Sequence, residues 1–147
     1  MRSLFLFVFL FFVIACHREK PTDHTTTVFA YYLKTAFGDS IRNEKHTYVM
    51  IPRMGCKGCR ENALSVLHRE IIKLGDKNLT YIFSPSVNLA DTLVQPCKFM
   101  IDNSELIDKI NLPISNIAIL KTENGKVISL VSVRSETTDS IGFYLRN

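Results

Sequence analysis

A pair of cysteines separated by two residues constrains the fold of this chain more than any other feature. Cys56 and Cys59 follow a short apolar run, residues 48–51, which predicts a β-strand. They precede a segment whose apolar residues recur at helical spacing, namely Ala63, Leu64, Leu67, Ile71 and Leu74. The motif is therefore expected at a helix N-terminus, where unpaired N–H groups and the helix dipole stabilise a thiolate. Because the thiolate is the form that attacks a disulfide, the sequence indicates a redox centre.

The start of the chain has the pattern of an export signal. Arg2 precedes an unbroken apolar run, residues 4–15, which is shorter than the roughly 20 residues that span a bilayer. The run ends at Val13-Ile14-Ala15-Cys16, which resembles the lipobox of bacterial lipoproteins. We expect residues 1–15 to be a signal peptide and Cys16 to carry acyl chains that anchor the protein to a membrane, facing the periplasm. An ordinary signal peptide with an incidental cysteine is the alternative.

The chain after the signal divides into a tether and one domain. Residues 16–26 contain the lipidated cysteine and a polar stretch that predicts a tether, and His17 and His24 are expected to be solvated there rather than to bind a metal. Residues 27–147 are long enough for a single domain with its own core. The net charge of +4 comes from both signs scattered along the chain, so nucleic acid is not an expected partner.

The domain alternates helical and extended patterns before ending in a hairpin. Helices are expected over residues 27–37, 60–74, 86–94 and 105–110, and strands over 48–51, 79–83 and 98–101. Asn124-Gly125 lies between two β-rich runs, 116–120 and 126–133, which predicts a hairpin with a tight turn. The last residues are expected to pack Ile141, Phe143 and Tyr144 onto the domain. This order predicts an α/β fold with a mixed sheet.

The order of strand, Cys-x-x-Cys, helix, strand, helix and hairpin resembles the thioredoxin fold. With the lipobox in front, it is similar to the membrane-anchored, envelope-facing thioredoxin-like proteins of the TlpA type, over residues 47–133. The resemblance implies a mixed central sheet flanked by helices, thiol–disulfide exchange with protein substrates, and no cofactor. It also implies that Cys56 is the exposed attacking cysteine and Cys59 the resolving one.

The chain departs from that family around the cysteines. Lys57-Gly58 replaces the usual proline-containing pair, and Gly55 stands where tryptophan is common. At the place of the family's cis-proline the chain has Ser115-Asn116, so either Pro113 takes that role through a longer loop or the proline is absent. We expect these three residues to form a substrate-facing loop. The family's buried acid, expected near Met50, is also absent.

Two basic residues beside the cysteines are expected to tune them. Lys57 and Arg60 place positive charge near Cys56, and nearby cations lower the pKa of a thiol. A more stable thiolate makes the reduced form of the cysteine pair more stable. These charges therefore favour a protein that oxidises its substrates. The direction of electron flow remains open at this stage.

Two other functions fit the same motif. One is a binding module with a structural disulfide, which the missing proline and acid favour. The other is soft-metal handling, because Met54, Cys56 and Cys59 match the Met-x-Cys-x-x-Cys pattern of copper carriers, and thiolates with a thioether suit Cu(I). A zinc site that adds Cys97 and His68 has no second spaced pair to support it. Cys97 is instead expected to be a buried free cysteine, with a regulatory or intermolecular role as the alternative.

Overall fold

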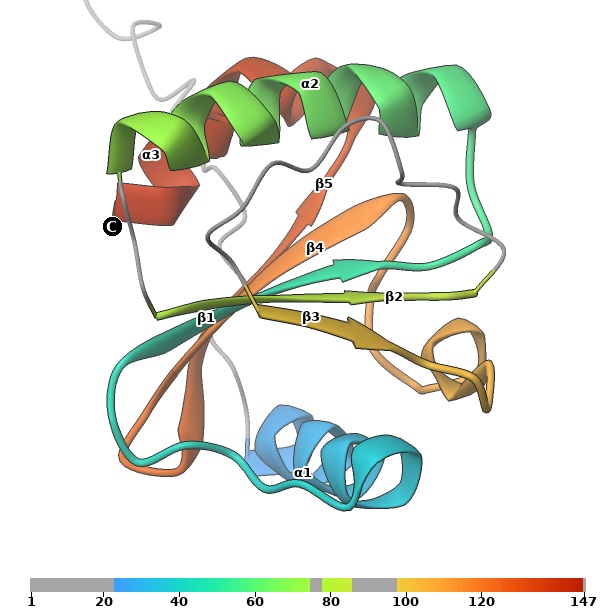
Figure 1. Ribbon diagram of the computed structural model, residues 1–147, viewed down its shortest axis with the longest axis vertical. Coiled ribbons are helices and arrows are strands. Elements are labelled where there is room, and N and C mark those ends of the chain that lie inside the picture. Colours follow the sequence, from blue (N-terminus) through green and yellow to red (C-terminus); the bar gives the residue numbers. More distant parts are fainter. Residues whose placement is uncertain (1–22, 75–77, 86–97, 147) are drawn as a thin grey trace, which may run out of the picture.

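A five-stranded sheet forms the middle layer of the molecule, between one helix on one face and two on the other (Figure 1). The computed structural model describes residues 23–74, 78–85 and 98–146. The strands are β1 (His46–Ile51), β2 (Leu79–Phe83), β3 (Lys98–Ile101), β4 (Ile117–Glu123) and β5 (Lys126–Val133). The helices are α1 (Asp23–Phe37), α2 (Lys57–Leu74) and α3 (Ile141–Arg146), with 3-10 turns η1 (Leu106–Asp108) and η2 (Ser135–Ser140).

The sheet is mixed, as the sequence predicts. Its strand order is β3-β2-β1-β4-β5, with β1, β2 and β3 parallel and β4 antiparallel to both of its neighbours. The β4–β5 hairpin turns at Asn124-Gly125, where both residues have positive φ, 52° and 70°. The expected hairpin is therefore confirmed. A mixed sheet with helices on both faces confirms the single-domain, thioredoxin-like α/β fold.

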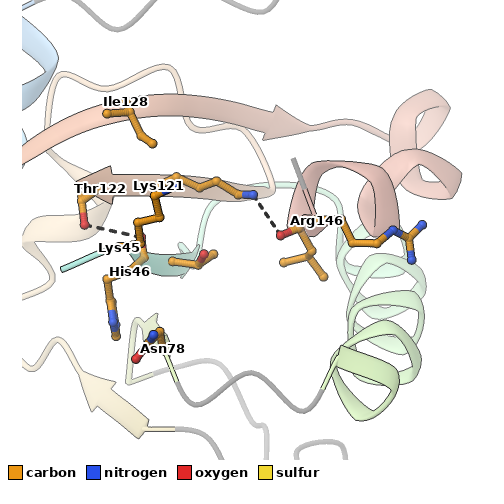
Figure 2. Close-up of a pocket in the computed structure, with 9 residues that line it drawn as sticks. Lys45, His46, Asn78, Lys121, Thr122, Ile128 and Arg146 are labelled. Carbon is orange, nitrogen blue, oxygen red and sulfur yellow. Dashed lines mark hydrogen bonds between the residues drawn. The ribbon is translucent and has the colours of Figure 1, made fainter.

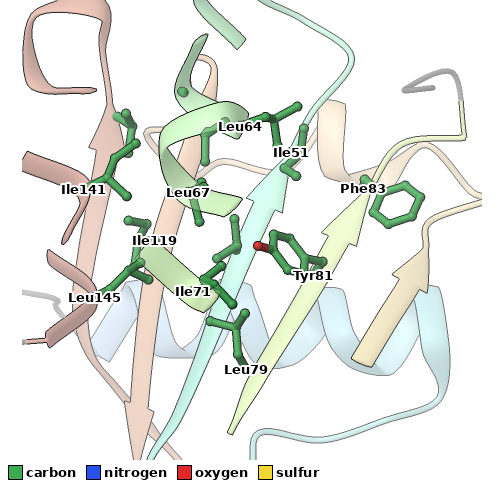
Figure 3. Close-up of a cluster of buried hydrophobic side chains, with 14 residues drawn as sticks. Ile51, Leu64, Leu67, Ile71, Leu79, Tyr81, Phe83, Ile119, Ile141 and Leu145 are labelled. Carbon is green, nitrogen blue, oxygen red and sulfur yellow. The ribbon is translucent and has the colours of Figure 1, made fainter. Parts of the chain in front are cut away.

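The two faces of the sheet carry separate apolar cores. Strands β1 and β2 are buried along their whole length, since helices cover both faces. Side chains alternate along β1, so Val49 and Ile51 face α2 while Tyr48 and Met50 face α1. The expected apolar stripe of α2 contacts the first face through four buried residues, Ala63, Leu64, Leu67 and Ile71 (Figure 3). The α1 face is filled by three buried side chains, Phe29, Tyr32 and Leu33.

Helix α1 begins at Asp23 rather than at residue 27, so His24 belongs to the helix and not to a tether. Two contacts account for the earlier start. Thr27 Oγ1 donates to the carbonyl of Asp23 at 2.9 Å, and Thr26 Oγ1 accepts a hydrogen bond from the backbone N–H of Val127 in β5 at 3.1 Å. The second contact fixes a polar segment to the sheet, which composition alone does not reveal.

The helix expected over residues 105–110 is only the short turn η1. Buried Asp102 accounts for the difference, because its carboxylate accepts from the N–H of Ile107 at 2.6 Å and of Ser104 at 3.0 Å. Glu105 takes a positive φ of 54°, which a regular α-helix does not allow. The cap from Asp102 and the left-handed conformation of Glu105 thus leave only Leu106–Asp108 in a helical turn.

The C-terminal segment packs on α2 through Ile141 and Leu145, both buried. The expectation for Phe143 is wrong, because its side chain is 57% exposed. In a helix as short as α3 only one side can face the core. The helix expected over residues 86–94 lies outside the described residues, as does Cys97. No helix of the described part of the chain has the length and apolar character needed to cross a membrane.

Candidate functional site

The two cysteines of the motif lie where strand β1 gives way to helix α2. Cys56 is exposed and directly precedes the helix, and Cys59 is half-buried in its first turn. Both are free thiols. The backbone N–H of Cys59 donates to Cys56 Sγ at 3.3 Å, and the N–H of Arg60 donates to the Cys56 carbonyl at 3.0 Å. Cys56 therefore caps the helix with its own sulfur, in the place that Ser or Asp commonly occupies.

The pKa values of the two thiols are shifted in opposite directions. The pKa of Cys56 is lowered, chiefly because the Cys59 thiol donates to its sulfur, with smaller contributions from the N–H groups of Cys59 and Gly58 and the charge of Arg60. The pKa of Cys59 is raised by the same thiol–thiolate hydrogen bond, by partial burial, and by the negative charges of Cys56 and Glu136. The arrangement thus favours one exposed thiolate beside one protonated thiol.

The two basic residues named from the sequence are placed differently. Arg60 lies close to the motif, and its guanidinium donates to the carbonyl of Arg53 at 3.0 Å. Lys57 points to Glu61, with 3.8 Å between its ammonium and the carboxylate, and both side chains are exposed. The charge of Lys57 is thus shared with a carboxylate one helical turn away.

The loop before β4 faces the cysteines. Asn116 Oδ1 accepts a hydrogen bond from the backbone N–H of Cys56 at 3.0 Å. The approach is so close that Gly55 has a φ of 120°, and a Cβ added there would lie 2.9 Å from the Ser115 carbonyl and collide with Asn116. The hydroxyl of Ser115 contacts that of Ser132 on β5 at 2.9 Å. The structure thus brings Ser115 and Asn116 to the cysteines.

Pro113 lies outside this contact. It is exposed, and no cis peptide bond occurs among the described residues. The side chain of Asn116 occupies the position next to Cys56 at which the family resemblance implies a proline.

Asp108 is a residue of the site that the sequence did not reveal. Its Oδ1 accepts from the backbone N–H groups of Arg53 and Met54, at 2.8 and 3.2 Å. Its Oδ2 is buried, with no hydrogen-bond partner among the described residues. Neighbouring Glu105 pairs with the Arg53 guanidinium at 3.3 Å. The only sequence signal was an acid at the end of an expected helix, and nothing local connects it to residues 53 and 54.

The turn that carries Asp108 is itself held in place by a buried carboxylate, that of Asp102. Asp102, at the end of β3, is fully buried and accepts from the Tyr32 hydroxyl of α1 at 3.2 Å. Burial is the main cause that raises the pKa of Tyr32 above its usual range, with Asp102 adding to it. The same carboxylate accepts from the N–H of Ile107. A path of hydrogen bonds therefore runs from α1 through η1 to the segment that leads into the cysteines.

Metal ligands are sparse in the described part of the chain. No group of three or more His, Cys, Asp or Glu side chains suited to a metal ion occurs within the described ranges. Met54 points outward, 64% exposed, and His68 is half-buried on α2. Two cysteines named above, Cys16 and Cys97, lie outside those ranges.

A separate cavity of about 240 Å³ lies at the opposite end of the sheet (Figure 2). It is lined by Lys45, His46, Thr47, Asn78, Lys121, Thr122, Ile128, Leu145 and Arg146. The ammonium of Lys121 donates to the Leu145 carbonyl at 2.9 Å, and Arg146 extends toward α2, where it pairs with Glu70 at 3.4 Å. Lys45 pairs with Glu123 at 3.5 Å. The three Lys and Arg side chains that line the cavity therefore all bind other groups of the protein.

In comparisons with known proteins, no family model, no curated protein and no solved structure matches the chain. The class is therefore defined by the fold and the site alone. The chain is a thioredoxin-like α/β protein that carries two free thiols, one exposed and one half-buried, at the N-terminus of α2.

Proposed function

We propose that this protein is a thiol–disulfide oxidoreductase that acts on protein substrates through Cys56 and Cys59. The observation that carries the proposal is the placement of exposed Cys56 at the N-terminus of α2, where its sulfur accepts the N–H of Cys59 at 3.3 Å; the lowered pKa of Cys56 and the raised pKa of Cys59 agree with it. An exposed thiolate next to a protonated thiol suits a two-step exchange, because the first sulfur can attack while the second waits. Because less than one turn of helix separates them, Cys59 is placed to attack the Cys56 sulfur once Cys56 is bonded to a substrate.

In the reducing direction the Cys56 thiolate attacks one sulfur of a substrate disulfide. The substrate S–S bond breaks, a Cys56–substrate disulfide forms, and the other substrate sulfur leaves as a thiolate that takes a proton. Cys59 then loses its proton and attacks the Cys56 sulfur, which releases the second substrate thiolate. The substrate gains two electrons, and the enzyme is left with a Cys56–Cys59 disulfide. The oxidising direction is the same sequence in reverse.

The cellular setting is a second part of the proposal. The Val13–Cys16 lipobox pattern supports a lipoprotein anchored through Cys16 in the cell envelope and facing the periplasm. An oxidising compartment allows disulfides to persist and to serve as substrates. The likeness to TlpA-type proteins in the order of elements supports the same setting, and the partners would be exported proteins with exchangeable cysteines.

A trapping experiment tests the reaction. In Cys59→Ser the second step is blocked, so mixed disulfides through Cys56 should accumulate in cell envelopes and disappear on reduction. The matched control is Cys56→Ser/Cys59→Ser, which should trap nothing. If the folded Cys59→Ser protein traps no more partner than the control, the proposal fails.

The reduction potential separates this proposal from the structural-disulfide alternative. The full chain carrying Cys97→Ala, in detergent, is equilibrated with glutathione and dithiothreitol buffers. A reversible couple between about −120 and −270 mV lies in the range of working oxidoreductases, whereas one below about −300 mV is typical of a structural disulfide. The position within the first range also gives the direction of electron flow.

A further inference from the structure

We propose that Asp108 is a positioning residue that holds the Arg53–Met54 backbone so that Cys56 presents its sulfur to the first turn of α2. This rests on the proposed function, in which Cys56 is the attacking thiolate. Asp108 does not touch the thiols. It acts through the segment that enters them, from a turn more than 50 residues further along the chain.

The geometry at Asp108 is that of a clamp. One carboxylate oxygen accepts two successive backbone N–H groups, from Arg53 at 2.8 Å and from Met54 at 3.2 Å. Both donors lie in exposed chain after β1, beyond the last β1–β2 pair of the described residues, Ile51 and Phe83. A carboxylate that accepts two N–H groups fixes backbone more firmly than a neutral acceptor does, because charge-assisted hydrogen bonds are about twice as strong.

A second side chain clamps the same segment from the other side. Asn116 accepts the N–H of Cys56, so three of four consecutive N–H groups from Arg53 to Cys56 are held by oxygens from η1 and from the loop before β4. Gly55 lies between the two clamps, at a φ of 120°. The direction of the chain at Cys56 is therefore set by contacts on both sides of a flexible glycine.

The clamp matters because the Cys56 sulfur can accept hydrogen bonds from the first turn of α2 only when it lies close to that turn. The sulfur lies 3.3 Å from the Cys59 N–H, which donates to it. A Cys56 that moves away from the helix loses this donor, and the thiolate becomes less favourable. Loss of the clamp should therefore make Cys56 less reactive at neutral pH.

An account based on charge alone predicts the opposite sign. If Asp108 acted only as a nearby negative charge, its removal would favour the Cys56 thiolate and increase reactivity. The clamp predicts a decrease. The sign of the change therefore distinguishes positioning from simple electrostatics.

The experiment measures the rate at which iodoacetamide alkylates Cys56, as a function of pH, in the reduced full chain carrying Cys16→Ala and Cys97→Ala. Asp108→Ala should lower the rate at pH 7 by roughly three- to ten-fold and move the inflection to a pH higher by about half to one unit. Asp108→Asn retains an oxygen acceptor with weaker hydrogen bonds, so its rate should fall by a smaller factor than that of Asp108→Ala. An unchanged or faster rate in folded Asp108→Ala would overturn the proposal, and so would an equal loss in Asp108→Asn.

The matched control is Glu105→Gln, which removes a carboxylate paired with the Arg53 side chain while leaving the clamp intact. Its alkylation rate should not fall, and a fall as large as that in Asp108→Ala would contradict the clamp. If Asp108→Ala does not fold, amide hydrogen exchange of the wild-type chain decides. The Arg53 and Met54 amides should exchange at least about a hundred-fold more slowly than free peptide, and exchange at the free rate would overturn the proposal. Neither readout requires turnover, so a failure of the proposed catalysis would leave this result distinct.

Discussion

Two glycines with positive φ lie at opposite ends of the sheet, and their surroundings differ in kind. Gly125, at a φ of 70°, forms the β4–β5 turn between paired residues Glu123 and Lys126. Gly55, at a φ of 120°, lies between β1 and α2, where the acceptors for its neighbours come from η1 and from the loop before β4. The first is a two-residue turn whose own residues favour its conformation, although distant carbonyls also contact it, since Asn43 and Arg42 accept from the N–H groups of Asn124 and Gly125 at 2.7 and 3.2 Å. The second is a bend fixed by residues distant in sequence.

The two bends differ in how much of their conformation the local sequence encodes. An Asn-Gly pair between two β-rich runs contains its own turn chemistry, because both residues tolerate the positive φ that a two-residue hairpin needs. Gly55 contains no such signal. Its conformation follows from the approach of Asn116, which is 60 residues from Cys56 along the chain.

The largest expected effect is that of Gly55→Ala. A Cβ at this position would lie 2.9 Å from the Ser115 carbonyl and against the Asn116 side chain, in a conformation that alanine rarely adopts. Strain and overlap together should lower the free energy of unfolding by about 2–3 kcal/mol and separate the cysteine segment from the β4 loop. Urea denaturation measures the first effect, and the alkylation rate of Cys56, which should fall, measures the second.

Gly125→Ala is the matched control for that prediction. Its Cβ would lie 3.3 Å from Asn43 Oδ1, a tight but adjustable contact, so only the backbone strain remains, about 1 kcal/mol. The alkylation rate of Cys56 should not change. If the two alanine variants lost equal stability, or if both slowed alkylation, the contrast between the two bends would be wrong.

Elements whose determinants are local could be predicted. The four β1 residues expected as a strand, the apolar stripe of α2 and the hairpin all follow from periodicity and turn chemistry. The two wrong boundaries have a shared cause. The start of α1 depends on a hydrogen bond between Thr26 and Val127 of β5, and the start of η1 depends on Asp102, which accepts from the N–H of Ile107 while Glu105 takes a positive φ. The first contact is tertiary, and the second depends on a tertiary contact because Asp102 is itself held by the Tyr32 hydroxyl of α1.

The candidate site divides along the same line. Cys56 and Cys59 follow from the motif, and the Ser115-Asn116 loop follows from a family resemblance over residues 47–133. Asp108 could not be found, since its partners are 54 and 55 residues away and an acid near a helix end is ordinary. The placement of Lys57 beside Glu61 depends on side-chain packing at the helix surface, which a one-dimensional pattern does not specify.

A smaller effect is expected from substitutions of Asn116. They distinguish the loss of the hydrogen bond to Cys56 from the addition of a negative charge at the same place. Asn116→Ala removes the acceptor for the Cys56 N–H and should cost about 1 kcal/mol of stability. Asn116→Asp keeps an oxygen acceptor, so its stability should stay closer to that of the wild type. Its new negative charge beside Cys56 should nevertheless raise the pKa of that thiol and slow alkylation. Denaturation and alkylation measured on both variants check this, and faster alkylation in Asn116→Asp would contradict the placement of the side chain.

The smallest expected effect concerns Glu70, where a local and a distant partner meet at one side chain. Its carboxylate pairs with Lys73 at 2.8 Å, one turn along α2, and with Arg146 of α3 at 3.4 Å. The pKa of Glu70 is lowered, chiefly by the hydrogen bond from Lys73 and then by the charges of Lys73 and Arg146. A depressed folded-state pKa gives stability that is present above the unfolded value of about 4.3 and is lost as the pH falls through the folded value.

Glu70→Gln should therefore reduce stability at neutral pH and flatten its decline below about pH 4.3, as followed by urea midpoints across a pH series. The two partners can be ranked in the same way. Lys73→Met should flatten the acid-side decline more than Arg146→Met, because the closer, local cation contributes more to the shift. The reverse order would mean that the contact between α2 and α3 dominates, so that at Glu70, as at Gly55, the distant partner decides.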